Sequence, residues 1–303
     1  MHRAFSGALC RRGLLALALG GTAVALPSLA AAHRNLRNPT CNQVIHASVT
    51  LVHDMFCSLP AEQAAIVIGS GGITVNLNGF RIVNTSGQTG TTGVDDFSQG
   101  SFNRVTIENG EINGFDDGIG VIGGGRDKIA NVIVTHQSDE GIFFGNAHHA
   151  LLTNVNASSN GCDGIDMHNN NGVTVMNSKA DRNGCNGIVD TTSLATINHV
   201  KTNHNADDGI SVDFPMVVGG VAYLIENSTA NANHKNGFEI QDNAPPTYGV
   251  KLIDNSAENN TGTNATSPTG WGYWAAMPAP GKGNGAEGNA SGSCFQVPCH
   301  VNP

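Results

Sequence analysis

Short apolar runs alternate with turn-forming residues through the middle of the chain, at a nearly constant spacing. A glycine followed by an apolar residue recurs six times, at Asp117-Gly118-Ile119, Glu140-Gly141-Ile142, Asp163-Gly164-Ile165, Asn186-Gly187-Ile188, Asp208-Gly209-Ile210 and Asn236-Gly237-Phe238. The steps between these glycines are 23, 23, 23, 22 and 28 residues. A second apolar patch lies between successive glycines, as in Val132-Ile133-Val134. Each period therefore predicts short strands separated by turns, not helices.

This period predicts an all-β fold, a right-handed parallel β-helix whose coils of roughly 22–23 residues stack to share one core. Leucine-rich repeats have a similar length, but their regular leucine spacing is missing, and WD-type blades need about twice the period. We expect an N-terminal cap at residues 33–65, the β-helix at 66–260, and a Gly-, Asn- and Pro-rich cap or tail at 261–303. Residues 84–103 look like an inserted loop.

The first 32 residues have the pattern of a signal peptide. Basic residues precede an apolar run from Leu14 to Leu26, and Ala30-Ala31-Ala32 follows as a cleavage site. We therefore expect a secreted or periplasmic protein, and the pair Arg11-Arg12 leaves the twin-arginine route open as the path of export. No later apolar stretch approaches the roughly 20 residues of a membrane span.

The charge balance narrows the classes of partner. The signal segment holds three arginines and no acids, so its removal takes the formal charge from -9 to -12, with 12 basic against 24 acidic residues. This balance disfavours nucleic acid, because phosphate binding draws on clustered Lys and Arg. An anionic substrate would meet the same repulsion unless a divalent cation bridged it. We expect a monomer that binds no nucleic acid.

Six cysteines remain once Cys10 leaves with the signal segment, and an even number in an oxidising compartment suggests disulfides. Cys162 and Cys185 each lie two residues before the turn glycine of consecutive coils. Stacking brings their Cα atoms roughly 4.8 Å apart, within disulfide range, although two stacked free thiols remain the alternative. The other predicted pairs close short loops, Cys41 with Cys57 and Cys294 with Cys299.

Candidate chemistry follows the turn glycine in the third repeat. Side chains alternate along a strand, so Ile165 and Met167 should point inward while Asp166 and His168 face solvent as a possible acid and base pair. Asp213 should share a column with His168 two coils later, and Asp190 lies one place out of register, at the corner. The candidate catalytic group is thus Asp166, His168, Asp190 and Asp213. A plain solvated strand face is the competing interpretation.

A column of acidic residues precedes the turn glycines and is a candidate for substrate or ion binding. Its members are Asp117, Glu140, Asp163 and Asp208, with Asp116, Asp139 and Asp207 one place earlier. Neighbouring carboxylates raise one another's pKa or recruit a cation, so calcium is the one candidate cofactor, at Asp139, Glu140 and Asp163. The alternative is that Asp before Gly is what a tight turn selects.

Residues 66–260 resemble the right-handed β-helix proteins of the pectin-lyase-like superfamily. The stretch Gly164-Ile165-Asp166-Met167-His168 is similar to the G-F-D-P-H stretch of the mannuronan C5-epimerases. That resemblance implies that Asp166 and His168 remove and return a proton at the sugar C5. The family's tyrosine before this glycine is Asp163 here, and its Arg-His pair falls at Asp207 and Asp208.

We therefore expect an exported, carbohydrate-active protein that acts on polysaccharide, with uronate-containing chains among the candidates. The reaction would be of the lyase, epimerase or hydrolase type, along one face of the β-helix. The competing hypothesis is a non-catalytic binding or structural protein of the cell surface or periplasm.

Overall fold

The computed structural model describes residues 36–191, 194–213, 223–241, 250–263, 269–276 and 278–301, which belong to one compact unit, residues 33–303. The expected signal segment lies outside the described residues. None of the described residues forms a helix with the length and apolar character that crossing a membrane would require. All of the regular structure within the described ranges is β-strand.

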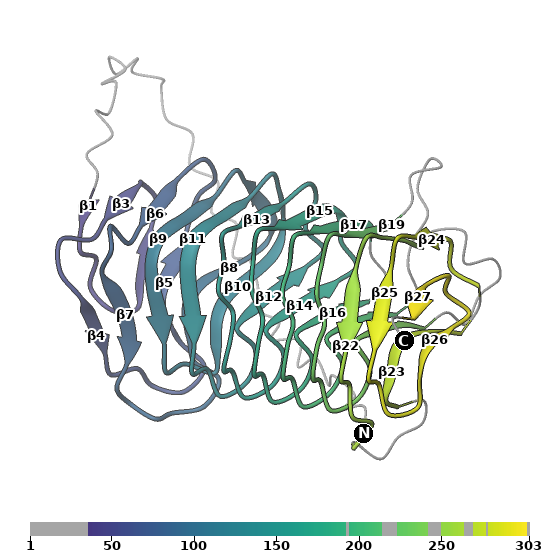
Figure 1. The fold of residues 1–303 in the computed structure, drawn as a ribbon. Coiled ribbons are helices and arrows are strands. Elements are labelled where there is room, and N and C mark those ends of the chain that lie inside the picture. The colour runs from purple at the N-terminus through teal and green to yellow at the C-terminus, as the bar shows by residue number, and fades with distance from the viewer. Residues whose placement is uncertain are drawn as a thin grey trace, which may run out of the picture. The chain divides into compact units, whose positions relative to one another are not determined.

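The strands stack in parallel to form two long sheets, and each coil contributes a strand to both (Figure 1). In the described part of the chain, the longest path of the 13-stranded sheet runs through β1 (Leu36–Arg37), β3 (Val49–Thr50), β6 (Thr74–Asn76), β9 (Thr106–Asn113), β11 (Lys128–Thr135), β13 (Leu151–Thr153), β15 (Asn171–Met176), β17 (Leu194–Asn198), β19 (Tyr223–Glu226), β21 (Val250–Ile253) and β24 (Gly281–Lys282). This sheet also includes β4 (Met55–Cys57) and β7 (Arg81–Asn84), which joins it beside β9.

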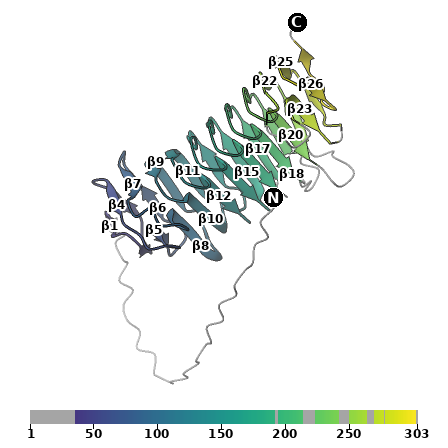
Figure 2. The same cartoon turned by 90° about the horizontal axis from the view of Figure 1, so that it is seen from below.

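The second long sheet carries the turn-glycine repeat at the start of its strands. Its 11 strands within the described residues are β2 (Gln43–Ile45), β5 (Ala64–Ile68), β8 (Thr92–Asn103), β10 (Asp117–Gly125), β12 (Ile142–Gly145), β14 (Ile165–His168), β16 (Ile188–Thr191), β18 (Ile210–Asp213), β20 (Phe238–Gln241), β23 (Trp271–Ala275) and β26 (Gly292–Phe295). A short third sheet joins β22 (Ser256–Glu258), β25 (Gly285–Glu287) and β27 (His300–Val301). Figure 2 shows the successive coils following one another in chain order.

The core is built from columns of identical or similar apolar residues, one from each coil. The residue after each turn glycine pairs in register with its equivalent in the next coil and is 0 % exposed, which gives the column Ile119, Ile142, Ile165, Ile188, Ile210, Phe238 and Tyr273. At its end the rings of Phe238 and Tyr273 stack with centroids 4.9 Å apart. This register confirms the predicted repeat, since each coil buries its apolar side against its neighbours.

The parallel pairing extends beyond the expected boundaries at residues 66 and 260. Strand β2 pairs with β5 through Gln43↔Ile66, and β23 and β26 continue the same sheet after β20. The segment 84–103, which we expected as an inserted loop, instead contains the 12-residue strand β8, paired with β5 and β10. Its glycine- and serine-rich sequence hid the strand, which is held by backbone pairing on both sides.

Buried asparagines connect the coils at one turn. A side-chain oxygen in one coil accepts the backbone N–H of the equivalent residue in the preceding coil, as Asn205 Oδ1 does for Asn183 at 2.9 Å. The same contact repeats along a column that we call the asparagine ladder, formed by Gln137, Asn160, Asn183, Asn205, Asn233, Asn260 and Asn289. The ladder satisfies backbone N–H groups that the turn removes from water.

Three disulfides join the cysteine pairs that the sequence predicted, Cys41–Cys57, Cys162–Cys185 and Cys294–Cys299. The Cα atoms of Cys162 and Cys185 are 4.4 Å apart because the two residues stack in consecutive coils. The expected pairing is confirmed.

Replacing Asn205 with alanine should lower the free energy of unfolding by about 2–4 kcal/mol. The change leaves the buried N–H of Asn183 without its acceptor and removes the amide that donates to Asn233. Urea unfolding of Asn205→Ala, beside the control Thr196→Ala on an outward strand position, measures the effect. Equal losses in the two variants would contradict a stabilising role for the ladder.

Candidate functional site

Strand β14 presents two polar side chains on the outer face of the second long sheet. In register, Asp166 lies between Phe143 and Val189, and His168 lies between Gly145 and Thr191. The predicted alternation is therefore confirmed. Exposure differs from expectation, however: the His168 side chain is 45 % exposed, but that of Asp166 is only 10 % exposed. Asp166 is therefore not a freely solvated carboxylate.

The imidazole of His168 and the carboxylate of Asp166 form a close pair. His168 Nε2 lies 2.7 Å from Asp166 Oδ1 and 2.9 Å from Oδ2. The hydrogen bond to Asp166 raises the pKa of His168 and outweighs the opposing effect of partial burial. The ring of Phe143 from the preceding coil lies beside the imidazole, with centroids 5.7 Å apart. Asp166 thus orients a half-exposed imidazole and favours its protonated form.

Two further carboxylates face this pair. One oxygen each from Glu140, Asp163 and Asp166 lies within 4.8 Å of the others, and this group is the carboxylate cluster. Burial, followed by the charge of Asp166, raises the pKa of Asp163 to about 7. Burial, followed by the hydrogen bond with Asp117, raises the pKa of Glu140 to about 9. Near neutral pH Glu140 therefore keeps its proton and Asp163 is about half protonated, unless a cation replaces these protons.

The carboxylate cluster could hold a metal ion, since hard cations prefer oxygen ligands. Asp139, which we expected beside Glu140 and Asp163 in a calcium set, groups instead with Glu140 and Cys162. The sulfur of Cys162 is bonded to Cys185 and is not available as a thiolate ligand. Asp166 is the third carboxylate that meets Glu140 and Asp163.

The column before the turn glycines also has a structural role. Asp163 Oδ1 accepts the backbone N–H of Asn186 at 2.7 Å, and Asp208 Oδ1 accepts that of Asn236 at 2.8 Å. Asp208 is 1 % exposed and lies 2.8 Å from Lys235 Nζ. It is therefore enclosed in the fold, and Asn186 separates it from Asp163 in the column. Asp207 lies next to it in the sequence, with its backbone N–H donating to Cys185 at 2.8 Å.

Asp190 is not at a corner of the coil, as we expected, but inside it. It pairs in register with Met167 and Val212 and is 0 % exposed. The Tyr223 hydroxyl donates a hydrogen bond of 2.8 Å to its carboxylate, which makes burial of this acid tolerable. Asp190 therefore cannot touch a substrate on the sheet face.

Asp213 shares the outward column of His168, with Thr191 between them. At the usual strand spacing, two coils separate the backbones of His168 and Asp213 by roughly 10 Å. The structure thus brings together Asp166, His168, Asp163 and Glu140, and it leaves Asp213 farther along the same face. Sequence reasoning missed Asn186 as the donor to Asp163, although the 23-residue repeat places the two in one column.

Comparison with known proteins places this architecture in a family. A sequence family described as "Right handed beta helix region" matches residues 117–273, which is more than half of the chain. The chain belongs to this family. No curated protein matches this right-handed β-helix chain in sequence.

Solved structures share the β-helix fold at low sequence identity. The mannuronan C-5 epimerase AlgE4 A-module of Azotobacter vinelandii matches with a TM-score of 0.50 and 15 % identity, covering 84 % of this chain and 83 % of that one. The AlgE6 A-module from the same organism gives 0.52 and 15 %, with 84 % and 81 % covered. The Dettilon tailspike protein (gp208) gives 0.50 and 13 %, with 86 % and 60 % covered. At these identities the likeness shows the fold.

The raised pKa values of the carboxylate cluster predict a stability that falls as pH rises from about 5 to 9. In that window the folded protein keeps protons on Asp163 (pKa about 7) and Glu140 (pKa about 9) that the unfolded chain has lost. Glu140→Gln removes one such group, so its melting temperature should fall less than that of the wild type. Thermal unfolding at pH 5, 7 and 9 tests this.

The exposed Glu287 provides the control, because Glu287→Gln changes the same chemistry away from the cluster. If Glu140→Gln and Glu287→Gln show the same dependence on pH as the wild type, the cluster does not hold its protons in the folded state.

Proposed function

We propose that the chain is an exported enzyme that acts on polysaccharide by proton transfer at the outer face of the second sheet. The observation that carries the proposal is the Asp166–His168 pair, in which a buried carboxylate holds a half-exposed imidazole beside two more carboxyls. A general acid or base needs this combination of access, fixed orientation and shifted pKa. The three disulfides support an oxidising compartment, and hence export.

Access to the site favours a lyase or epimerase over a hydrolase. Glycoside hydrolases act through two carboxyl groups that flank the scissile bond. Here Asp163 and Asp166 are only 8 % and 7 % exposed, whereas the His168 side chain is 45 % exposed. The group that can reach a substrate is therefore an imidazole and not a pair of carboxyls.

In this proposal His168 is the group that touches the sugar. A neutral imidazole removes a proton from the ring carbon next to a carboxylate, and the resulting negative charge moves onto that carboxylate. Return of a proton from a donor on the other face gives the epimer. Alternatively, the bond to the neighbouring glycosidic oxygen breaks, that oxygen leaves and takes up a proton, and a double bond remains in the ring. Asp166 positions His168, and protonated Glu140 and Asp163 can donate hydrogen bonds to the charge that develops.

The comparisons support a carbohydrate substrate by fold alone. Two of the similar structures are A-modules of mannuronan C-5 epimerases, and a third is a tailspike protein. The stretch from Gly164 to His168 resembles the epimerase motif, whereas Asp163, Asp207 and Asp208 depart from it. The proposal therefore specifies acid–base chemistry on polysaccharide and leaves lyase and epimerase as its two outcomes.

His168→Ala should lower kcat/KM by about 10²–10⁴-fold on whichever glycan the wild type turns over, because the proton-transfer group is lost. A panel of uronate-containing and neutral polysaccharides is assayed for new double bonds, epimerised residues and reducing ends. The exposed His234 gives the control His234→Ala. Turnover by His168→Ala at the wild-type rate would refute the site assignment, and glycan binding without turnover would favour the non-catalytic alternative.

Asp166→Asn tests the positioning role separately, through the dependence of activity on pH. If neutral His168 is the base, activity rises as pH passes the raised pKa of His168. Removing the charge of Asp166 lowers that pKa, so the rising limb should move to lower pH while kcat falls. An unchanged pH profile in Asp166→Asn would contradict the proposed coupling.

Calcium binding at the carboxylate cluster is the second candidate, favoured by the three converging carboxylates. A cation would displace the protons of Glu140 and Asp163, so its binding should strengthen as pH rises. Millimolar calcium at pH 8 should raise the melting temperature by about 5 °C in the wild type but not in Glu140→Gln. No response of the wild type to calcium or to a chelator would remove this role.

A further inference from the structure

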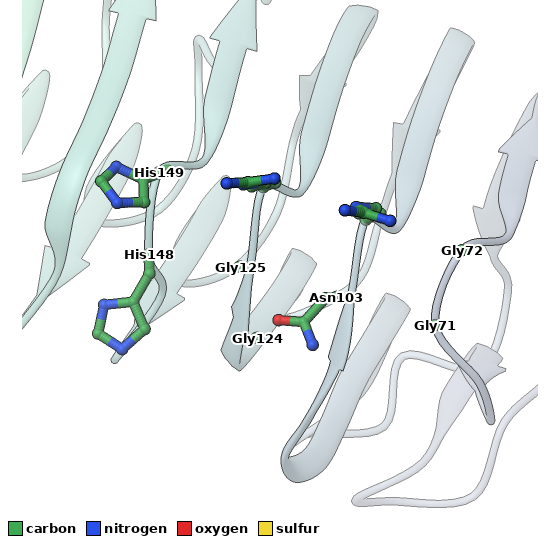
Figure 3. Close-up of a pocket in the computed structure, with 9 residues that line it drawn as sticks. Gly71, Gly72, Asn103, Gly124, Gly125, His148 and His149 are labelled. Atoms are coloured by element: carbon green, nitrogen blue, oxygen red, sulfur yellow. The ribbon is translucent and has the colours of Figure 1, made fainter.

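A hollow lies on the ridge of turns that leads from the second sheet to the first. It measures about 620 Å³ and spans four successive coils (Figure 3). In Figure 3 the residues His148 and His149 lie on one coil, Gly124 and Gly125 on the next, and Asn103 on the one after that. The strands that end here are β8, at Asn103, and β10, at Gly125. We call this hollow the ridge pocket.

Glycines keep the ridge pocket open. A Cβ atom on Gly71 would lie 2.8 Å from the carbonyl oxygen of Asn103, and one on Gly124 would lie 2.1 Å from that of Phe102. Gly124 also has a φ of +77°, in the left-handed region where glycine carries no steric cost. Side chains are thus excluded from the floor, and the pocket is bounded by the groups on its rim.

The rim is positively charged in a chain that is otherwise acidic. Arg104, Arg126, His148 and His149 line the pocket, all four are exposed, and no carboxylate lines it. Among the described residues, neither arginine forms an ion pair, in contrast to Arg81, which lies 2.8 Å from Asp54. The rim therefore carries two arginine charges that no ion pair among the described residues neutralises.

The acid closest in sequence, Asp127, is directed to the backbone of the ridge. It is 2 % exposed, and its Oδ1 accepts the N–H of Val105 at 2.9 Å. These contacts bury its carboxylate beneath the turn and leave the two guanidinium groups to solvent. The pocket can consequently receive an external anion without first breaking an internal salt bridge.

The turn geometry places Arg104, Arg126 and His149 at equivalent backbone positions in successive coils. Arg104, Arg126 and His149 have φ values of 60°, 61° and 54°, at the position that Gly72 occupies in an earlier coil. Arg104 donates its N–H to Gly125, and Arg126 donates its N–H to His148, so each residue is fixed one coil from the next, roughly 4.8 Å away. A left-handed conformation costs a non-glycine residue about 1–2 kcal/mol and is tolerated best by Asn. Three cationic or imidazole side chains in succession there call for a functional explanation.

We propose that the ridge pocket binds anionic substituents, carboxylate or sulfate, on a polysaccharide that lies along the axis of the β-helix. Guanidinium groups bind such planar or tetrahedral oxyanions through two N–H donors at once. Because Arg104 and Arg126 lie one coil apart, they can bind neighbouring anionic substituents of a single polysaccharide chain. This inference rests on the proposed function in one respect, namely that the ligand is a polysaccharide.

The ridge pocket is close enough to the sheet face for one chain to reach both. His148 pairs with Asn171, and Asn171 lies three residues after His168 in the next coil. A chain held at the ridge pocket would therefore extend toward the Asp166–His168 pair. The chain's formal charge of -9 would repel an acidic glycan. The arginines of the ridge pocket give this part of the surface the opposite charge and so reduce that repulsion.

The test is calorimetric binding of hexasaccharides that carry carboxylates, carry sulfates or are neutral. Wild-type protein should bind at least one acidic class more tightly than the neutral one, with affinity falling as salt rises. Arg126→Gln and Arg104→Gln should each weaken that binding about tenfold. Arg126→Lys, which keeps the charge but loses the two-donor geometry, should fall between Arg126→Gln and the wild type.

Arg182→Gln is the matched control, because Arg182 is exposed and also left-handed, with φ 58°, but lies on a different turn. Equal binding of acidic and neutral glycans by the wild type, or equal affinities in Arg126→Gln and Arg182→Gln, would refute the proposal that the ridge pocket binds anionic substituents. The proposed function is tested separately: His168→Ala should keep the binding and lose the turnover. Binding that depends on Arg126 without any turnover would support the ridge pocket as a binding site and refute the proposed enzymatic function.

Discussion

The structure depends on satisfying backbone N–H groups that stacking removes from water at every turn. A β-helix buries the inner side of each turn between two others, and an unpaired buried N–H costs about 1–3 kcal/mol. The asparagine ladder meets this demand: Asn205 is 0 % exposed and accepts from Asn183, while Asn233 accepts from Asn205. One amide side chain per coil therefore fixes both the position of the turn and its register with the next coil.

Fixed register is what makes a site possible on this fold. Phe143, Asp166 and Val189 occupy one outward column only because their turns cannot slip by a residue, and a slip would exchange inner and outer faces. Asp163 takes part both in the stacking of the turns and in the carboxylate cluster, since it accepts the N–H of Asn186 and faces Asp166 and Glu140. The chemistry of the carboxylate cluster is consequently built on the same contacts that hold two coils together.

The sequence predicted the repeat, its register and the three disulfides, because each follows from the spacing of single residues. It failed where a residue's role depends on a partner far away in the chain. Asp190 looked like a surface acid, but Tyr223, 33 residues later, makes its burial inside the coil possible. Likewise, the spacing of Arg104, Arg126 and His149 matches the coil repeat, yet their grouping becomes apparent only when arginine and histidine are compared together.

Asp and Asn side chains accept the same hydrogen bond in the turn, but only Asp carries a charge. This difference distinguishes residues that only stabilise the turn from residues that can also take part in chemistry. The column before the turn glycines reads Asp163, Asn186, Asp208, Asn236, and in each the side-chain oxygen accepts the next coil's N–H. Asn would serve the turn equally well at all four positions. Asp208 and Glu239 share the positive charge of Lys235. The carboxyl of Asp163 instead faces Asp166 and Glu140, and among the described residues no lysine or arginine forms an ion pair with these three. Such a group is stable only with bound protons or a cation, which makes this coil the one where chemistry is expected.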